Sequence, residues 1–104
     1  MGKIVINVAL IGLGRIGQMH GGNLFSHKSF KLKYTFDINT KLNQKYSKKF
    51  HAKPINNPKI AFEDKNIDVV FIASSTPTHI KLIEEAAKYK KVIFCEKPLD
   101  LNID

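Results

Sequence analysis

Three glycines and one aspartate are spaced as in sites that bind a phosphate-containing ligand. Gly12, Gly14 and Gly17 form a G-x-G-x-x-G pattern after an apolar run, and Asp37 follows twenty residues later. In this pattern the first glycine permits a tight turn, the second lets a pyrophosphate approach the backbone, and the third lets the next helix pack closely. These residues therefore predict a dinucleotide site at a strand–turn–helix junction.

The charge of such a ligand indicates which groups would touch it. The first turn of the helix, with Arg15 and Ile16, would offer backbone N–H groups and a partial positive charge to the phosphates. Asp37 is placed to accept hydrogen bonds from the ribose hydroxyls, and its charge would repel a 2′-phosphate. We therefore expect NAD to be favoured over NADP as the cofactor. Two simpler interpretations stay open here: the glycines form a turn that binds nothing, and Asp37 only caps the next turn.

A second group of polar residues follows another apolar run. Ser74, Ser75 and Thr76 could place hydroxyls and backbone groups beside the dinucleotide, although Thr76 also suits the role of a helix cap. His79 lies just inside the helix that would follow, and it is a candidate cofactor-site residue whose alternative role is structural. The remaining histidines share no ligand spacing, so no metal site is expected.

Alternating segments of strand and helix type would carry these residues. We expect strands at residues 4–11, 32–36, 52–55, 68–73 and 92–95, and helices at residues 15–26, 40–50, 58–66 and 76–89. This alternation predicts right-handed crossovers and a parallel sheet, so the fold class is α/β, a Rossmann-type doubly wound sheet of order 3-2-1-4-5. The glycine turn, Asp37, residues 74–79 and Glu96–Lys97 would then lie at the carboxyl ends of the strands, where such sheets bind ligands.

The apolar spacing also predicts which helix faces meet the sheet. The first helix would pack through Ile16, Met19, His20 and Leu24, and the fourth through Ile80, Leu82, Ile83 and Ala87. Residues 28–31 are expected to form a turn. Gly21 and Gly22 weaken the first helix by roughly 1 kcal/mol each relative to alanine.

The positive charge of the chain comes almost entirely from lysines that are distributed along the sequence. Of the seventeen Lys and Arg residues, Arg15 is the only arginine, and the formal net charge is +8 over 104 residues. Specific nucleic-acid readers use arginine for bidentate contacts, so we interpret the lysines as a solvated surface; a basic nucleic-acid or anion-binding protein is the alternative. No apolar run approaches the ~18 residues of a membrane helix. The single cysteine, Cys95, excludes an internal disulfide, is expected to be buried and inert, and fits a cytoplasmic protein.

The stretches GLGRIG and ASSTPTHIKLIEEAAKYKKVIFCEKP, with the LDL that follows, resemble the Gfo/Idh/MocA oxidoreductases across essentially the whole chain. Within this family the similarity is greatest to inositol 2-dehydrogenases. The resemblance implies hydride transfer between NAD and a CH–OH group of a polyol or sugar. It further implies that Lys97 is the active-site lysine, contacting the substrate hydroxyl and the nicotinamide ribose, that Glu96 lies near that ribose, and that the Lys97–Pro98 bond is cis.

The sequence departs from the family pattern at its end. Family members continue into a second α/β domain that carries the substrate pocket and a D-x-x-x-H motif, whereas the sequence stops at Asp104. We therefore expect residues 1–104 to be an incomplete NAD(P)-binding Rossmann domain without the substrate domain, inactive alone because oxidation of an alcohol needs a base at the hydroxyl. A non-catalytic nucleotide-binding module from a truncated gene is an alternative. The last strand would present an unpaired edge, which favours a homo-oligomer.

Overall fold

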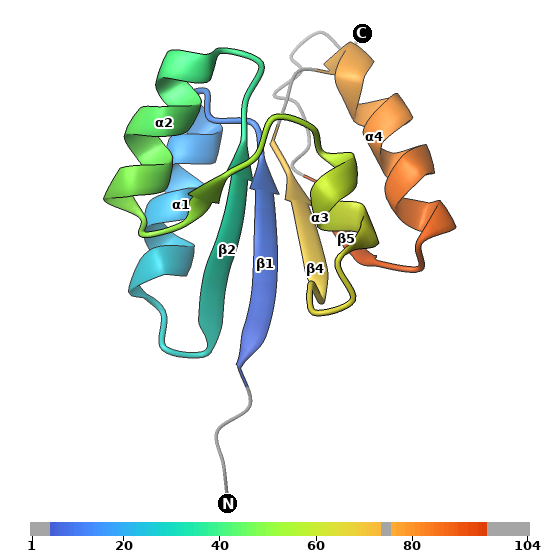
Figure 1. The fold of residues 1–104 in the computed structure, drawn as a ribbon, viewed down its shortest axis with the longest axis horizontal. Helices are drawn as coiled ribbons and strands as arrows, with labels where there is room; N and C mark the ends of the chain where they lie inside the picture. Colours follow the sequence, from blue (N-terminus) through green and yellow to red (C-terminus); the bar gives the residue numbers. More distant parts are fainter. Residues whose placement is uncertain (1–4, 74–75, 96–104) are drawn as a thin grey trace, which may run out of the picture.

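The computed structural model describes residues 5–73 and 76–95. It contains a five-stranded parallel sheet in the order β3-β2-β1-β4-β5, as the sequence predicted. Helices cover both faces of the sheet, with α1 and α2 on one side and α3 and α4 on the other (Figure 1). The elements are β1 (Ile6–Ile11), α1 (Arg15–Ser26), β2 (Phe30–Phe36), α2 (Thr40–Lys49), β3 (Lys53–Pro54), α3 (Lys59–Glu63), β4 (Val69–Ile72), α4 (Thr76–Lys88) and β5 (Val92–Cys95).

The central strand β1 is apolar because both of its faces are covered. Val8 and Leu10 join the core cluster under α1 and α2, whereas Ala9 and Ile11 join the cluster under α3 and α4. All four are at most 1% exposed. A parallel strand buried on both sides needs a continuous apolar run, and this explains why β1 shows no alternation of polar and apolar residues.

Several element boundaries differ from the sequence prediction because pairing with a neighbouring strand decides them. The turn expected at 28–31 is present but ends at residue 29, because β2 already begins at Phe30, which lies opposite Ile6 of β1. The third strand, expected over 52–55, is reduced to two residues, and the proline in it has no N–H to donate. The third helix is likewise shorter than the predicted 58–66.

The face that α1 turns to the core contains two glycines besides Leu24, which packs against the core cluster as predicted. Gly17 and Gly21 are its buried residues, whereas Met19, predicted to face the core, is 54% exposed. A Cβ atom on Gly21 would lie 2.5 Å from Cε2 of Phe50 and 3.0 Å from Cδ2 of Leu10. The absence of a side chain there therefore lets α1 lie close to the sheet.

The packing face of α4 also differs from the prediction by one residue. Leu82 and Ala86 are buried against the sheet, whereas Ala87, predicted to face it, is exposed. Residues four apart lie on one side of a helix, so Leu82 and Ala86 share the packing face. Within the described residues, none of the helices is both long and apolar enough to span a membrane.

Candidate dinucleotide site

The turn after β1 gives each of its three glycines a different role. Gly12 has a φ of 105°, a conformation that favours glycine. A Cβ atom on Gly17 would overlap the carbonyl oxygen of Gly12, so only glycine allows α1 to begin this close to the turn. Gly14, by contrast, is exposed, and a Cβ atom on it would meet none of the described residues within 4 Å. The space beside Gly14 is therefore open to a ligand.

Hydrogen bonds hold this turn in one conformation. The backbone N–H of Gly12 donates to the carbonyl oxygen of Phe36 at 2.8 Å, and the N–H of Leu13 donates to Oδ2 of Asp37 at 2.6 Å. On the other side, Nε2 of Gln18 donates to the carbonyl oxygen of Leu13 at 3.0 Å. The Leu13 side chain is fully buried. The turn is thus fixed before any ligand arrives.

The start of α1 lies beside Gly14 and has no side-chain cap. Gly14 is its N-cap and provides no side-chain hydrogen bond, and the first turn holds no acidic residue. The first N–H groups of a helix lack partners within the helix, and together they carry a partial positive charge. Arg15 is exposed and Ile16 is half-buried in this first turn. An anionic group placed beside Gly14 would meet these donors.

Asp37 stands at the carboxyl end of β2, next to the glycine turn. Its Oδ2 accepts the bond from Leu13, and its Oδ1 accepts a bond of 2.8 Å from the backbone N–H of Asn39. The carboxylate therefore does cap the following turn, as the simpler interpretation held. Each carboxylate oxygen has a second lone pair, so the half-buried group can still accept bonds from ribose hydroxyls.

The structure brings the glycine turn and Asp37 together, and it sets the end of β4 beside them. The backbone N–H of Ala73, after β4, donates to the carbonyl oxygen of Ile11 at 2.8 Å. Thr76 and His79 lie in α4, which begins at this edge. The predicted residues Ser74, Ser75, Glu96 and Lys97, and with them the Lys97–Pro98 bond, lie outside the described residues. Cys95 ends β5 and is partly buried against the core.

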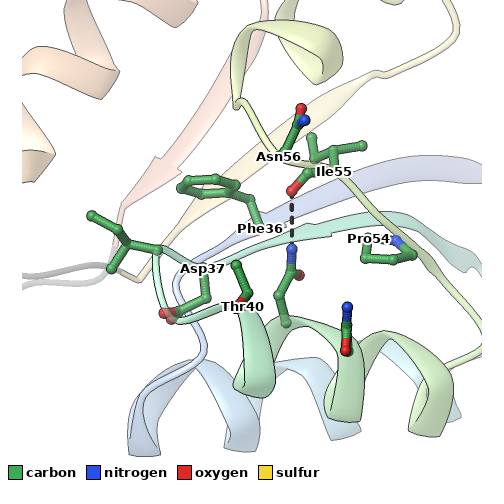
Figure 2. A pocket seen from close by; sticks show the side chains of 9 residues that line it. Phe36, Asp37, Thr40, Pro54, Ile55 and Asn56 are labelled. Atoms are coloured by element: carbon green, nitrogen blue, oxygen red, sulfur yellow. Dashed lines mark hydrogen bonds between the residues drawn. The ribbon is translucent and has the colours of Figure 1, made fainter.

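A pocket that the sequence did not predict lies beside Asp37, between β2, the start of α2 and the segment that includes and follows Pro54. Figure 2 shows side chains from these three elements around it, and the pocket measures about 290 Å³. It is lined by Phe36, Asp37, Ile38, Thr40, Asn43, Gln44, Pro54, Ile55 and Asn56. Ile38 is 89% exposed although it is apolar. An apolar residue directly after the acidic one, outside the helical pattern, was the signal that could have revealed it.

A separate polar cluster on the α3 and α4 side of the sheet surrounds Asp64. Its Oδ2 accepts bonds from Oη of Tyr34 at 2.6 Å and from Nζ of Lys33 at 2.9 Å. The bond from Tyr34, followed by those from Lys33 and the backbone of Asn66, holds the pKa of Asp64 well below its ordinary value. Lys91 adds bonds to the backbone oxygens of Asp64 and Ile67. This cluster joins β2 to the turns before β4 and β5, and its role is structural.

These features define the class of protein. In a parallel sheet of this order the sequence of strand addition reverses between β1 and β4, and ligands of such sheets bind at the carboxyl ends of the strands near that point. The glycine turn lies there, with an uncapped helix start on one side and a carboxylate at the end of the neighbouring strand. This is the architecture of dinucleotide-binding α/β domains.

Comparison with known proteins gives the family. Residues 6–104 match the model of the Gfo/Idh/MocA oxidoreductase family, NAD-binding Rossmann fold, and the chain belongs to this family. It is 39% identical over 99 residues to the myo-inositol 2-dehydrogenase of Thermotoga maritima, matching 94% of this chain and 30% of that protein. The crystal structure of a myo-inositol dehydrogenase from Corynebacterium glutamicum superposes with a TM-score of 0.84 at 31% identity, over 95% of this chain and 30% of that one.

A third comparison concerns the fold alone. KijD10, a 3-ketoreductase from Actinomadura kijaniata crystallised with NADP and TDP-benzene, gives a TM-score of 0.83 at 20% identity, over 91% of this chain and 30% of that one. The same fold therefore also occurs in a complex with NADP. This chain spans about 30% of the length of the relatives that it matches.

Proposed function

We propose that this chain is the dinucleotide-binding part of an NAD-dependent dehydrogenase that acts on an inositol or a similar polyol. The observation that carries the proposal is the glycine turn, where Gly14 leaves open space before an uncapped helix start and Leu13 is tied to Asp37. The substrate class is supported by relatives that are myo-inositol dehydrogenases. NAD, when bound, supplies the acceptor for a hydride that leaves a ring carbon.

The residues of this chain would share the work of holding that cofactor. The backbone from Gly12 to Gly17, with Arg15 and Ile16 in the first turn of α1, would bind the phosphates, and Asp37 would bind the adenosine ribose and favour NAD over NADP. Residues Ser74, Ser75, Thr76 and His79 are proposed for the opposite wall. Glu96 and Lys97 are proposed for the reacting end, with Lys97 as the catalytic residue.

Turnover would need residues beyond this dinucleotide-binding part. The matched relatives are more than three times as long as these 104 residues, and we propose that residues 1–104 are an NAD(P)-binding domain and that the substrate pocket belongs to a second domain. An alcohol must lose a proton as its carbon loses a hydride, and acid/base help contributes roughly 10²–10⁴-fold to such a step. NADH formation from myo-inositol by this chain alone should therefore not exceed background.

The test of the proposed cofactor site is titration calorimetry with NAD⁺ on two alanine variants. Gly14→Ala adds a methyl group in open space at a φ of −71°, which alanine adopts readily, so the fold should be unchanged. The methyl group would hold a phosphate away from the backbone, and the affinity for NAD⁺ should fall by at least about tenfold. Gly22→Ala, also with nothing within 4 Å, is the matched control and should bind like the wild type.

Two outcomes would count against the proposed site. Equal NAD⁺ affinities for Gly14→Ala and the wild type would remove the glycine turn from the binding site. Binding that collapses when salt rises from roughly 50 to 200 mM would point instead to a polyanion, because counterion release makes nucleic-acid affinity steeply dependent on salt.

We also propose that the chain self-associates through the edge of the sheet, in the cytoplasm. Among the residues that the structure describes, β5 pairs with β4 alone, and Val92 and Phe94 on one of its faces are 64% and 53% exposed. Ile93 and Cys95, on the other face, pack against the core. An unpaired edge with exposed apolar side chains favours pairing with another chain. The cytoplasmic location rests on the single cysteine.

A further inference from the structure

A chain of buried hydrogen bonds borders the pocket beside Asp37. Oγ1 of Thr35 donates to Oδ1 of Asn43 at 2.8 Å, and Nδ2 of Asn43 donates to the carbonyl oxygen of Ile55 at 2.9 Å. The backbone N–H of Ile55 then donates to the carbonyl oxygen of Thr35 at 3.0 Å. Thr35 is fully buried and Asn43 is 6% exposed. These three residues, which we name the β2–α2–β3 clamp, join β2, α2 and the residue directly after β3 in one closed network.

The clamp lies next to β3, the shortest strand of the sheet. β3 has only two residues, paired with Tyr34 and Thr35 of β2, and the wall of the pocket begins directly after them. Ile55 and Asn56 form this wall and line the pocket together with Asp37 and Thr40; Figure 2 draws the bond that reaches Ile55 as a dashed line. The amide of Asn43 is therefore the side-chain tie between this wall and α2.

The alternative is that the clamp only satisfies polar groups of the core. Buried polar side chains are nearly always hydrogen-bonded, whatever their function. Ser47 provides the comparison, because it lies one turn further along α2, is 3% exposed and donates to the carbonyl oxygen of Gln44 in its own helix. Ser47 is equally buried but ties no other element to α2 by its hydroxyl. It also lies outside the lining of the pocket beside Asp37.

We propose that Asn43 is a positioning residue for the dinucleotide site, holding Ile55 and Asn56 so that the pocket beside Asp37 keeps its width for the adenosine end of the ligand. This inference rests on the proposed function. Asn43 itself lines the pocket, and Phe36, Ile38, Pro54 and Ile55 give the pocket apolar surface that suits a purine nucleoside. Losing the bond from Asn43 removes the side-chain link between α2 and Ile55, so that β2 holds this wall through the backbone bond of Ile55, while the glycine turn keeps its own bonds to Asp37 and Gln18.

The experiment compares Asn43→Leu with Ser47→Ala, using NAD⁺ and ADP-ribose as calorimetric ligands and amide hydrogen exchange as the structural readout. Asn43→Leu should lower the affinities for NAD⁺ and ADP-ribose by the same factor, roughly tenfold. Both ligands carry the adenosine group, and the wall of the pocket that would hold this group loses one buried hydrogen bond. Exchange at the Ile55 amide should accelerate. Ser47→Ala should change neither affinity nor exchange at Ile55, even where it lowers stability.

A second variant covers the case in which Asn43→Leu does not fold. Thr35→Val keeps the shape of a β-branched side chain but removes the hydroxyl donor that orients Asn43. The affinities for NAD⁺ and for ADP-ribose should therefore both fall, as in Asn43→Leu. Wild-type affinity in the folded variants, or an equal loss in Ser47→Ala, would overturn the positioning role. Failure of the wild type to bind either ligand would instead refute the proposed function, and the two failures are thus distinguishable.

Discussion

Replacing Gly21 by alanine measures how closely α1 lies against the core. The added Cβ atom would lie 2.5 Å from Cε2 of Phe50 and 3.0 Å from Cδ2 of Leu10, and both of these side chains are buried. Two packed side chains must shift, and such overpacking costs about 1–3 kcal/mol of unfolding free energy. Alanine also favours the helical conformation by about 1 kcal/mol relative to glycine, which offsets part of this cost. The net loss should therefore be roughly 0–2 kcal/mol.

The neighbouring glycine supplies a matched control within the same helix. A Cβ atom on Gly22 would meet nothing within 4 Å, so Gly22→Ala should gain about 1 kcal/mol, or a melting temperature higher by about 4–8 °C. Urea unfolding followed by circular dichroism should then separate the two variants by about 1–3 kcal/mol, with Gly21→Ala the less stable. Equal stabilities would refute the close packing of α1, because both substitutions change the same helix by the same residue type.

Three further results are expected. Asp37→Asn should bring the affinities for NADP⁺ and NAD⁺ closer together, since the amide keeps an acceptor for Leu13 but lacks the charge that repels a 2′-phosphate; an unchanged ratio in calorimetry would argue against that role. Stability should fall as the pH drops below about 4, because the lowered pKa of Asp64 contributes stability that is complete above the unfolded-state pKa and lost on approach to the folded one. Urea midpoints should depend less on pH in Asp64→Asn, and identical profiles would contradict this account. Phe94→Lys should lower the average mass in light scattering, because it charges the exposed edge strand, and a wild-type chain that stays monomeric at high concentration would disprove self-association.

The sequence by itself determined the fold and placed the glycine turn and Asp37 at the centre of the candidate site. The spacing of Gly12, Gly14 and Gly17 after an apolar run predicted the turn, and Asp37 was predicted at the end of the second strand. Strict alternation of strand and helix then predicted the order of the sheet. These inferences succeeded because they depend on local backbone requirements and on connection rules, both of which can be read within short windows of sequence.

Only the tertiary structure decided which contacts close the site. The bond from Leu13 to Asp37 joins residues 24 positions apart, and that from Asn43 to Ile55 depends on how β3 meets β2. In the sequence, Asn43 is one polar residue among several on a lysine-rich helix, and nothing marks it as buried. Phe30 is part of β2 because it pairs with Ile6 of β1, which is distant in the sequence. Burial and pairing arise from segments distant in the chain, so no local pattern of side chains specifies them.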